Sequence, residues 1–162
     1  MALCCLLSLL VLWGCEDPSD AKLISTFRLH QKDLETLVAM SDEDARFVRI
    51  APGFAKTDNG SWAGSQSKGG LTPERWDEYR RLFAEAGLSG GLNRRYRNEV
   101  FLLANTEGIV GHGTALGYVY CGEPLPLGSE SYPPCEQHKE SFDGEKYRYE
   151  KIAPHWYIYE EY

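Results

Sequence analysis

The sequence is poor in the clustered ionisable residues with which enzymes bind metals and activate water. Its four histidines are scattered, and none stands in H-x-x-x-H or H-E-x-x-H spacing, which excludes the common zinc-hydrolase motifs. It also lacks a Gly-Lys-Ser/Thr phosphate loop, and the pair Gly111 and Gly113 has no third glycine to complete a dinucleotide-binding turn. We therefore expect no metal, no cofactor and no catalytic residue, and interpret the chain as non-enzymatic.

Positive charge is scarce as well. The 162 residues include 17 Lys and Arg against 24 Asp and Glu, a net charge of −7. This balance disfavours nucleic acid as a partner and electrostatic attachment to anionic lipid, and it suits a basic protein partner. The basic cluster Arg94, Arg95 and Arg97 around Tyr96 is interpreted as the polar face of an edge strand. The acidic run at residues 42–44 predicts a solvated helix end.

No apolar run is long enough to cross a membrane. The longest, Ala2 to Trp13, has about a dozen residues, whereas a helical span needs roughly 20. Its length is typical of the apolar region of a signal peptide. At its end, Leu12-Trp13-Gly14-Cys15 resembles the lipobox of bacterial lipoproteins.

This resemblance implies that residues 1–14 are a signal peptide that is removed. Cys15 would then carry the lipid, with a palmitate among its acyl chains. The protein would be anchored in the bacterial cell envelope and face the periplasm, on either the inner or the outer membrane. Two alternatives stay open: a secretory signal without lipid, and an N-terminal apolar segment that packs in the core.

The cysteines agree with an oxidising compartment. Cys4 and Cys5 would leave with the signal peptide, and Cys15 would be acylated. Cys121 and Cys135 remain and are predicted to form one disulfide, which would close a loop of about 15 residues and contribute roughly 3 kcal/mol. Free thiols and a pair of metal thiolates are the alternatives.

The rest of the sequence predicts a short tether, residues 15–22, followed by a single domain, residues 23–162. One helix is expected from about His30 to Ser41. A second is expected after the cap Thr72, with Pro73 at its first position and Gly87 at its end. Residues 56–70 are interpreted as a loop that carries Trp62 as an apolar anchor. The apolar alternation predicts strands at 46–51, 92–97, 99–104, 114–121, 146–152 and 155–161, with a hairpin turn at 105–108.

These elements predict an α+β fold, with two helices packed on a mainly antiparallel sheet of four to five strands. The order of three motifs resembles a group of small uncharacterised bacterial envelope proteins. The motifs are the helix Gly70–Phe83, the strand Gly117-Tyr118-Val119-Tyr120 and the ending Trp156-Tyr157-Ile158-Tyr159-Glu160. The resemblance implies a shared fold and compartment, and it brings no catalytic residues.

Aromatic residues are the strongest hint of function, because the chain has 10 Tyr and 4 Trp. Tyrosines that alternate along strands offer large, rigid surfaces for binding another protein. The candidate contact residues are Tyr118, Tyr120, Tyr132, Tyr157 and Tyr159, beside the Cys121–Cys135 loop. The alternative is that these tyrosines only cover a half-buried sheet.

The sequence therefore predicts a periplasmic lipoprotein that binds and neutralises a protein partner, such as a basic toxin or enzyme, in the manner of immunity proteins and inhibitors. Two further hypotheses are an envelope hydrolase with a site assembled from distant residues, and a structural or stress-related envelope lipoprotein.

Overall fold

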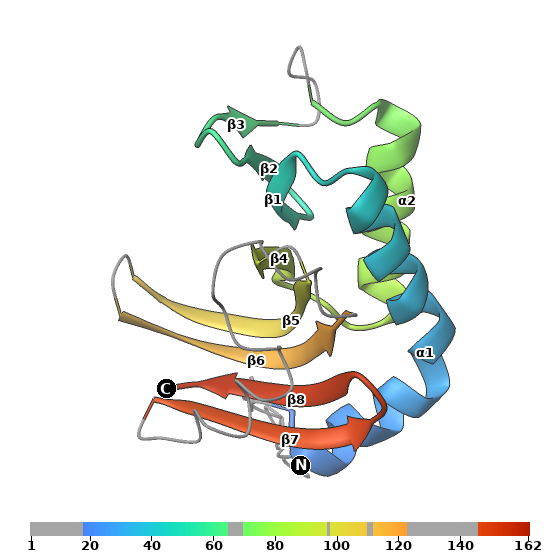
Figure 1. The fold of residues 1–162 in the computed structure, drawn as a ribbon, viewed down its shortest axis with the longest axis vertical. Coiled ribbons are helices and arrows are strands. Elements are labelled where there is room, and N and C mark those ends of the chain that lie inside the picture. Colours follow the sequence, from blue (N-terminus) through green and yellow to red (C-terminus); the bar gives the residue numbers. More distant parts are fainter. Residues whose placement is uncertain (1–17, 65–69, 97, 110–111, 123–145) are drawn as a thin grey trace, which may run out of the picture.

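In the part of the chain that the structure describes, two helices pack on one antiparallel sheet of eight strands (Figure 1). The computed structural model describes residues 18–64, 70–96, 98–109, 112–122 and 146–162. The predicted α+β class and antiparallel sheet are confirmed, whereas the predicted count of four to five strands is wrong. The signal peptide, Cys15, Tyr132 and Cys135 lie outside the described residues.

The sheet has the strand order β3-β2-β1-β4-β5-β6-β8-β7. Its strands are β1 (Phe47–Ala51), β2 (Phe54–Thr57), β3 (Trp62–Ala63), β4 (Gly91–Tyr96), β5 (Glu99–Ile109), β6 (His112–Cys121), β7 (Tyr147–Ala153) and β8 (Trp156–Glu161). The two strands at the β3 end, β2 and β3, were not expected, because the residues from Lys56 onward were interpreted as a loop. The predicted hairpin turn at 105–108 is also wrong, since β5 and β6 stay paired as far as Ile109 and His112.

Helix α1 (Asp20–Glu43) is twice as long as predicted. The Oγ of Ser19 caps it by accepting a hydrogen bond from the backbone N–H of Lys22. Asp20 to Lys22, the last residues of the predicted tether, therefore form its first turn. A kink at His30, where the backbone leaves helical geometry, separates the unexpected first half from the predicted second half.

Helix α2 (Pro73–Glu85) begins and ends where the sequence predicts. Thr72 accepts a hydrogen bond from the N–H of Arg75 at 3.2 Å, and Pro73 follows it. At the other end Gly87 has a φ of +67°, and the N–H of Leu88 donates to the carbonyl of Phe83 at 2.7 Å. This hydrogen bond and the positive φ of Gly87 are the features of a Schellman motif, which places the buried Leu88 against the end of the helix.

The helices cover one face of the sheet, and the main core lies between them (Figure 1). From α1, Phe27 contacts the rings of Tyr118 and Trp156 at centroid distances of 6.0 and 5.3 Å. The opposite face carries a second apolar cluster, here called the Tyr159 cluster, made of Phe101, Leu103, Val119, Cys121, Tyr157 and Tyr159. Along β8, Trp156 and Ile158 face the main core and Tyr157 and Tyr159 face the Tyr159 cluster, which agrees with the apolar alternation that predicted this strand.

Candidate interaction surface

One row of paired residues crosses the whole sheet on the face opposite the helices. Directly paired residues of antiparallel strands share a face, so the register identifies every member. From edge to edge the row reads Trp62, Lys56, Arg49, Asn93, Phe101, Val119, Tyr157 and Lys151. Its middle is buried in the Tyr159 cluster, and its first residue, Trp62, is strongly exposed.

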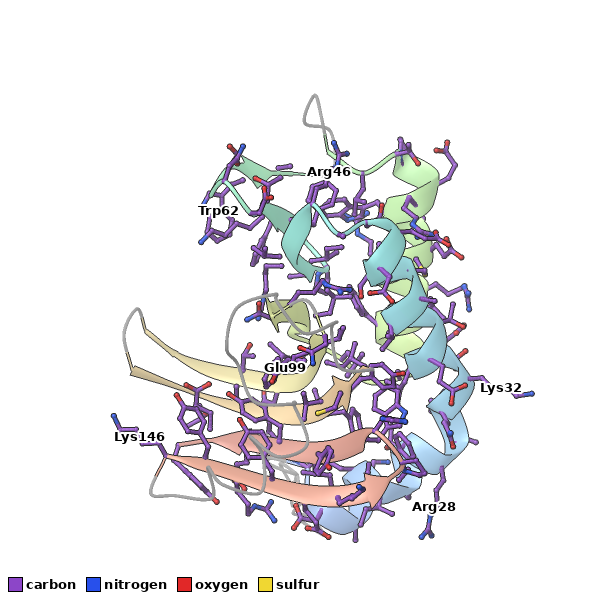
Figure 2. The ribbon with its side chains drawn as sticks, viewed as in Figure 1. Arg28, Lys32, Arg46, Trp62, Glu99 and Lys146 are labelled. Atoms are coloured by element: carbon purple, nitrogen blue, oxygen red, sulfur yellow. The ribbon has the colours of Figure 1, made fainter. Side chains whose placement is uncertain are left out.

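Trp62 lies on β3, at the edge of the sheet, with 64% of its surface exposed. Its ring packs on Phe54 at a centroid distance of 5.0 Å, and the Nζ of Lys56 lies 5.3 Å from the centre of the Trp62 ring. Figure 2 shows Trp62 at the outer end of the molecule, on the β2–β3 hairpin. We call Phe54, Lys56 and Trp62 the Trp62 surface.

The exposure of Trp62 follows from the strand period of two. Ala55 and Ala63, which pair with each other, face the core and are buried. Lys56 and Trp62, which also pair, must therefore face outward. A cation stacked on an indole and supported by a phenyl ring is a preorganised contact surface, because its side chains lose little freedom on binding. Sequence reasoning singled out Trp62 as an anchor in a loop, but did not pair it with Lys56.

The tyrosines predicted to contact a partner are mostly core residues. Tyr118 is fully buried, and its hydroxyl donates to the carbonyl of Leu23 in α1 at 2.9 Å. Tyr157 and Tyr159 are also buried, in the Tyr159 cluster. Tyr120 is partly buried and packs on Trp156 at 5.0 Å. The interpretation of Tyr118, Tyr157 and Tyr159 as an exposed contact surface is therefore wrong, because all three side chains are buried. The alternative interpretation, in which these tyrosines cover the sheet, agrees with their burial.

Burial of Tyr118 affects its acidity. Removal of its phenol from water disfavours the phenolate and raises the pKa of Tyr118 to about 12. Tyr118 therefore stays neutral at physiological pH and acts as a hydrogen-bond donor that holds the first half of α1 on β6.

The acidic end of α1 is bound by arginines, although Asp42 and Glu43 are exposed as predicted for a solvated helix end. Nη1 of Arg94 donates to Ser41 at 2.7 Å and to Asp42 at 2.6 Å. Nε of Arg75, from α2, donates to Asp44 at 2.7 Å, and its Nη2 donates to Glu43 at 2.7 Å. Carboxylates at a helix C-terminus meet the negative end of the helix dipole, so the two arginines offset an unfavourable placement.

Arg94 also corrects the interpretation of the basic cluster. Its strand, β4, lies between β1 and β5 in the interior of the sheet and is not an edge strand. Its side chain is 10% exposed and reaches the helix layer. Arg94 is therefore a structural residue of this fold.

Cys121 ends β6 in the Tyr159 cluster and is fully buried. It is a half-cystine. No other cysteine lies among the described residues, so the predicted pairing with Cys135 stays a prediction.

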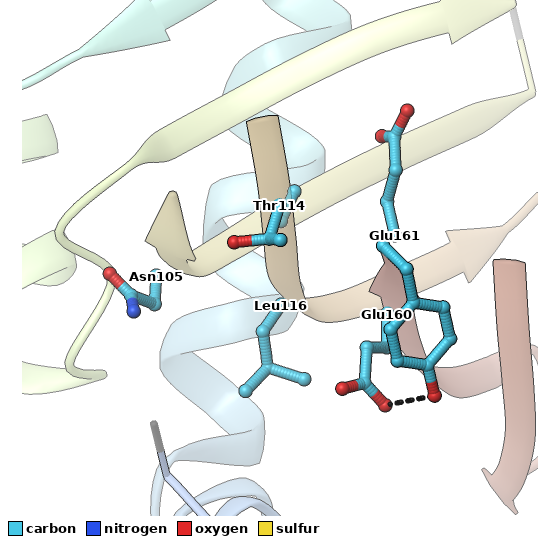
Figure 3. A pocket seen from close by; sticks show the side chains of 7 residues that line it. Asn105, Thr114, Leu116, Glu160 and Glu161 are labelled. Carbon is cyan, nitrogen blue, oxygen red and sulfur yellow. Dashed lines mark hydrogen bonds between the residues drawn. The ribbon is translucent and has the colours of Figure 1, made fainter. Parts of the chain in front are cut away.

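A small open pocket of about 120 Å³ lies where β5, β6 and β8 meet (Figure 3). Asn105, Thr114, Leu116, Glu160 and Glu161 line it, together with Ala115 and Tyr162. Its volume is well below the few hundred Å³ of an ordinary small-molecule site. Glu160 accepts hydrogen bonds from Arg148 at 2.8 Å and from the Tyr162 hydroxyl at 3.0 Å. These bonds occupy Glu160 in a structural role.

A motif of the G-x-S-x-G type was not recognised in the sequence analysis. Residues 87–91, Gly-Leu-Ser-Gly-Gly, match the G-x-S-x-G pattern of the esterase nucleophile elbow. An elbow lies between a strand and the helix that follows it, whereas this segment connects helix α2 to strand β4. The Ser89 hydroxyl donates to the carbonyl of Ala104 at 2.8 Å. The structural context of a nucleophile is therefore missing, and Ser89 links the turn to β5.

Within the described ranges, no group of three or more His, Cys, Asp or Glu side chains is placed to hold a metal ion. In the same part of the chain, neither helix has the length and apolar character needed to span a membrane.

Comparison with known proteins gives no relative. The chain matches no protein-family model, no curated protein and no solved structure.

Proposed function

We propose that this protein is a lipid-anchored, periplasmic binding protein that attaches to a protein partner through the Trp62 surface and neutralises it, without enzymatic activity of its own. The observation that carries the proposal is the 64% exposure of Trp62, a large aromatic side chain held on Phe54 and Lys56. Tryptophan is strongly enriched among the few residues that dominate the energy of protein interfaces.

The charge of the chain supports a protein of opposite charge as the partner. A net charge of −7 accelerates encounter with a basic protein over distances of about a Debye length. At the surface itself, Lys56 needs an acceptor, so the contacting group of the partner is a carboxylate or a carbonyl beside an apolar pocket that takes the indole.

The position of the Trp62 surface suits a tethered binder. Figure 1 shows β3 and the start of α1 at opposite ends of the longest axis of the molecule. Since the proposed lipid anchor at Cys15 lies five residues before Asp20, the anchor attaches near the start of α1. The Trp62 surface is then directed away from the membrane, toward partners in the periplasm.

The test compares capture from an envelope extract by the wild-type chain and by the variant Trp62→Ala. A stoichiometric protein should be recovered by the wild type, and its affinity should fall about 30-fold or more in the variant, the loss typical of an interface hot spot. Tyr162→Ala is the matched control, because Tyr162 is about as exposed as Trp62 but is not part of the Trp62 surface. A partner that binds both variants equally would contradict the assigned surface, and recovery of no partner would contradict the binding function.

The anchor is tested separately with Cys15→Ser. Wild-type protein should fractionate with membranes and carry acyl chains on Cys15 by mass spectrometry. The serine variant should be released into the soluble fraction, and a variant that still sediments with membranes would contradict the lipoprotein assignment.

A further inference from the structure

We infer that α1 from Asp20 to Lys32 lies on an anionic lipid surface through a basic face made of Lys22 and Arg28 before the kink at His30 and Lys32 just after it, around Leu29. This inference deepens the proposed function and rests on it for the position of the lipid anchor. It assigns a second membrane contact to a chain whose net charge of −7 disfavours one.

The cations before the kink lie on one side of the helix. At 100° per residue, Lys22, Arg28 and Leu29 fall within about a third of the helix circumference, and Lys32 follows two residues after the kink at His30. The buried residues of the same half, Leu23 and Phe27, lie on the other side. Figure 2 shows Arg28 and Lys32 extending away from the body of the protein.

These cations are not used within the described part of the chain. Lys22, Arg28 and Lys32 are exposed, and no described carboxylate lies within ion-pair distance of them. The nearby acids, by contrast, are engaged. Asp20 binds Arg148, Asp33 binds His30 at 3.0 Å, and Glu35 accepts a hydrogen bond from Gln31 at 2.9 Å. Between Ala21 and Leu29 the helix carries Lys22 and Arg28 and no acidic residue, so this stretch is locally positive although the protein is acidic.

Leu29 gives this face an apolar centre. It is 78% exposed, more than any other large hydrophobic residue among those described. A leucine surrounded by lysine and arginine is the pattern of a helix that lies in a membrane interface, where the apolar side chain enters the headgroup region and the cations meet lipid phosphates.

The chain before α1 brings this face to the membrane. Four residues lie between Cys15 and Asp20, and the five Cα-to-Cα steps span at most about 18 Å when fully extended. An acyl chain on Cys15 therefore holds the first turn of α1 close to the headgroups. Even a modest attraction then suffices, because the anchor supplies a high effective concentration.

The test follows the environment of residue 29 in the lipidated chain. The variant Leu29→Cys carries a polarity-sensitive fluorophore and is reconstituted into vesicles of phosphatidylcholine, with or without phosphatidylglycerol. A blue shift should appear only with phosphatidylglycerol and should disappear in high salt. The same label on Asn59→Cys, at the exposed tip of the β2–β3 hairpin, should show no shift.

Charge reversal provides the decisive comparison. Lys22→Glu, Arg28→Glu and Lys32→Glu together should abolish the shift. A matched control, Arg46→Glu, Arg81→Glu and Lys146→Glu, changes the net charge equally at exposed positions elsewhere and should retain it. Circular dichroism checks that both variants remain folded. Equal behaviour of the two triple variants would overturn the inference.

A second arm separates this inference from the lipid anchor. The full chain with Cys15→Ser is mixed at low salt with vesicles of phosphatidylglycerol alone and sedimented. Its partition should fall roughly a hundred-fold in the α1 triple variant, since each basic residue contributes about five-fold. If Cys15 carries no acyl chain, the proposed anchor fails and this arm decides the inference. If neither arm depends on the α1 cations, the inference fails while the anchor stands.

Discussion

Arg75 and Asp44 connect the two helices through a bond of 2.7 Å between Nε and Oδ2. The same carboxylate oxygen accepts a hydrogen bond from the hydroxyl of Tyr79 at 3.1 Å. Burial and the adjacent Asp44 carboxylate raise the pKa of Tyr79 above its ordinary value, so the phenol stays protonated and serves as a donor. Although burial opposes the charge of Arg75, the bonds to Asp44 and Glu43 raise the pKa of the guanidinium.

Removal of Arg75 should therefore destabilise the fold. Arg75→Met leaves Asp44, which is 20% exposed, without its cation, and we expect a loss of about 2–3 kcal/mol in the free energy of unfolding. Arg81→Met removes an exposed pair with Glu85 and should cost less than about 0.5 kcal/mol. Urea denaturation of both variants measures the difference. Equal stabilities would show that the Arg75 network is only a surface feature.

The pair Asp20 and Arg148 should make stability depend on pH. Two bonds of 2.7 and 2.8 Å from Arg148 lower the pKa of Asp20 below its ordinary 3.8. The folded chain thus binds its proton less readily than the unfolded chain. The resulting stabilisation is present above pH 3.8 and is lost as the pH falls through the lowered folded-state value.

The variant Asp20→Asn isolates this contribution. Because the pair is partly exposed, we expect a difference from wild type below about 1 kcal/mol at neutral pH. The difference should shrink toward zero in acid, as measured by urea denaturation across the pH range. A difference that stays constant with pH would assign the effect to something other than the charge of Asp20.

Gly91 should not tolerate a side chain. Its φ is +74°, and a Cβ at this position would overlap the carbonyl oxygen of Ile50 on the paired strand β1. We expect Gly91→Ala to cost more than about 2 kcal/mol, because backbone strain and a clash add together. Gly53→Ala is the control, since a Cβ there meets nothing within 4 Å. Thermal unfolding of both variants tests the contrast.

The hydroxyl of Tyr118 should matter for stability rather than for binding. Tyr118→Phe leaves the buried carbonyl of Leu23 without this donor, and we expect a loss of about 1–2 kcal/mol. Tyr162→Phe, on an exposed side chain, should have little effect. Partner capture should be unchanged by Tyr118→Phe at temperatures where the variant is folded, and reduced capture would restore the tyrosine hypothesis.

The pairing of Cys121 with Cys135 stays a prediction that peptide mapping can test. Digestion without reductant should yield Cys121 linked to Cys135, and the double variant Cys121→Ala with Cys135→Ala should lose roughly 3 kcal/mol. A linkage of Cys121 to any other cysteine would contradict the predicted pairing.

Local signals explain which elements the sequence predicted correctly. Thr72, Pro73 and Gly87 act through backbone groups one turn away, so both ends of α2 are readable from the sequence. The alternation in β8 is equally local. By contrast, the first half of α1 is separated from the regular apolar pattern by the kink at His30. It is held by Tyr118 and Arg148, which lie far along the chain.

Contacts between residues far apart in the sequence explain the features that were not predicted. Strands β2 and β3 are short and lie in or beside a Gly- and Ser-rich segment, and they exist because β1 supplies the neighbouring edge. Alternating tyrosines look the same in a sequence whether their face is open or covered, so the burial of Tyr157 and Tyr159 was not predictable. The Trp62 surface depends on the register that places Lys56 opposite Trp62, which only the folded sheet defines.

The placement of arginines at both ends of α1 has a mechanical consequence. Arg148 holds its first turn to β7 and β8, while Arg75 and Arg94 hold its last turn to α2 and β4. If the proposed lipid anchor and the proposed partner both hold the protein, tension between them acts from Ser19 to the Trp62 surface on β3. We expect the arginine contacts at both ends of α1 to resist this tension, so that α1 stays attached to the rest of the fold on either side of its kink at His30.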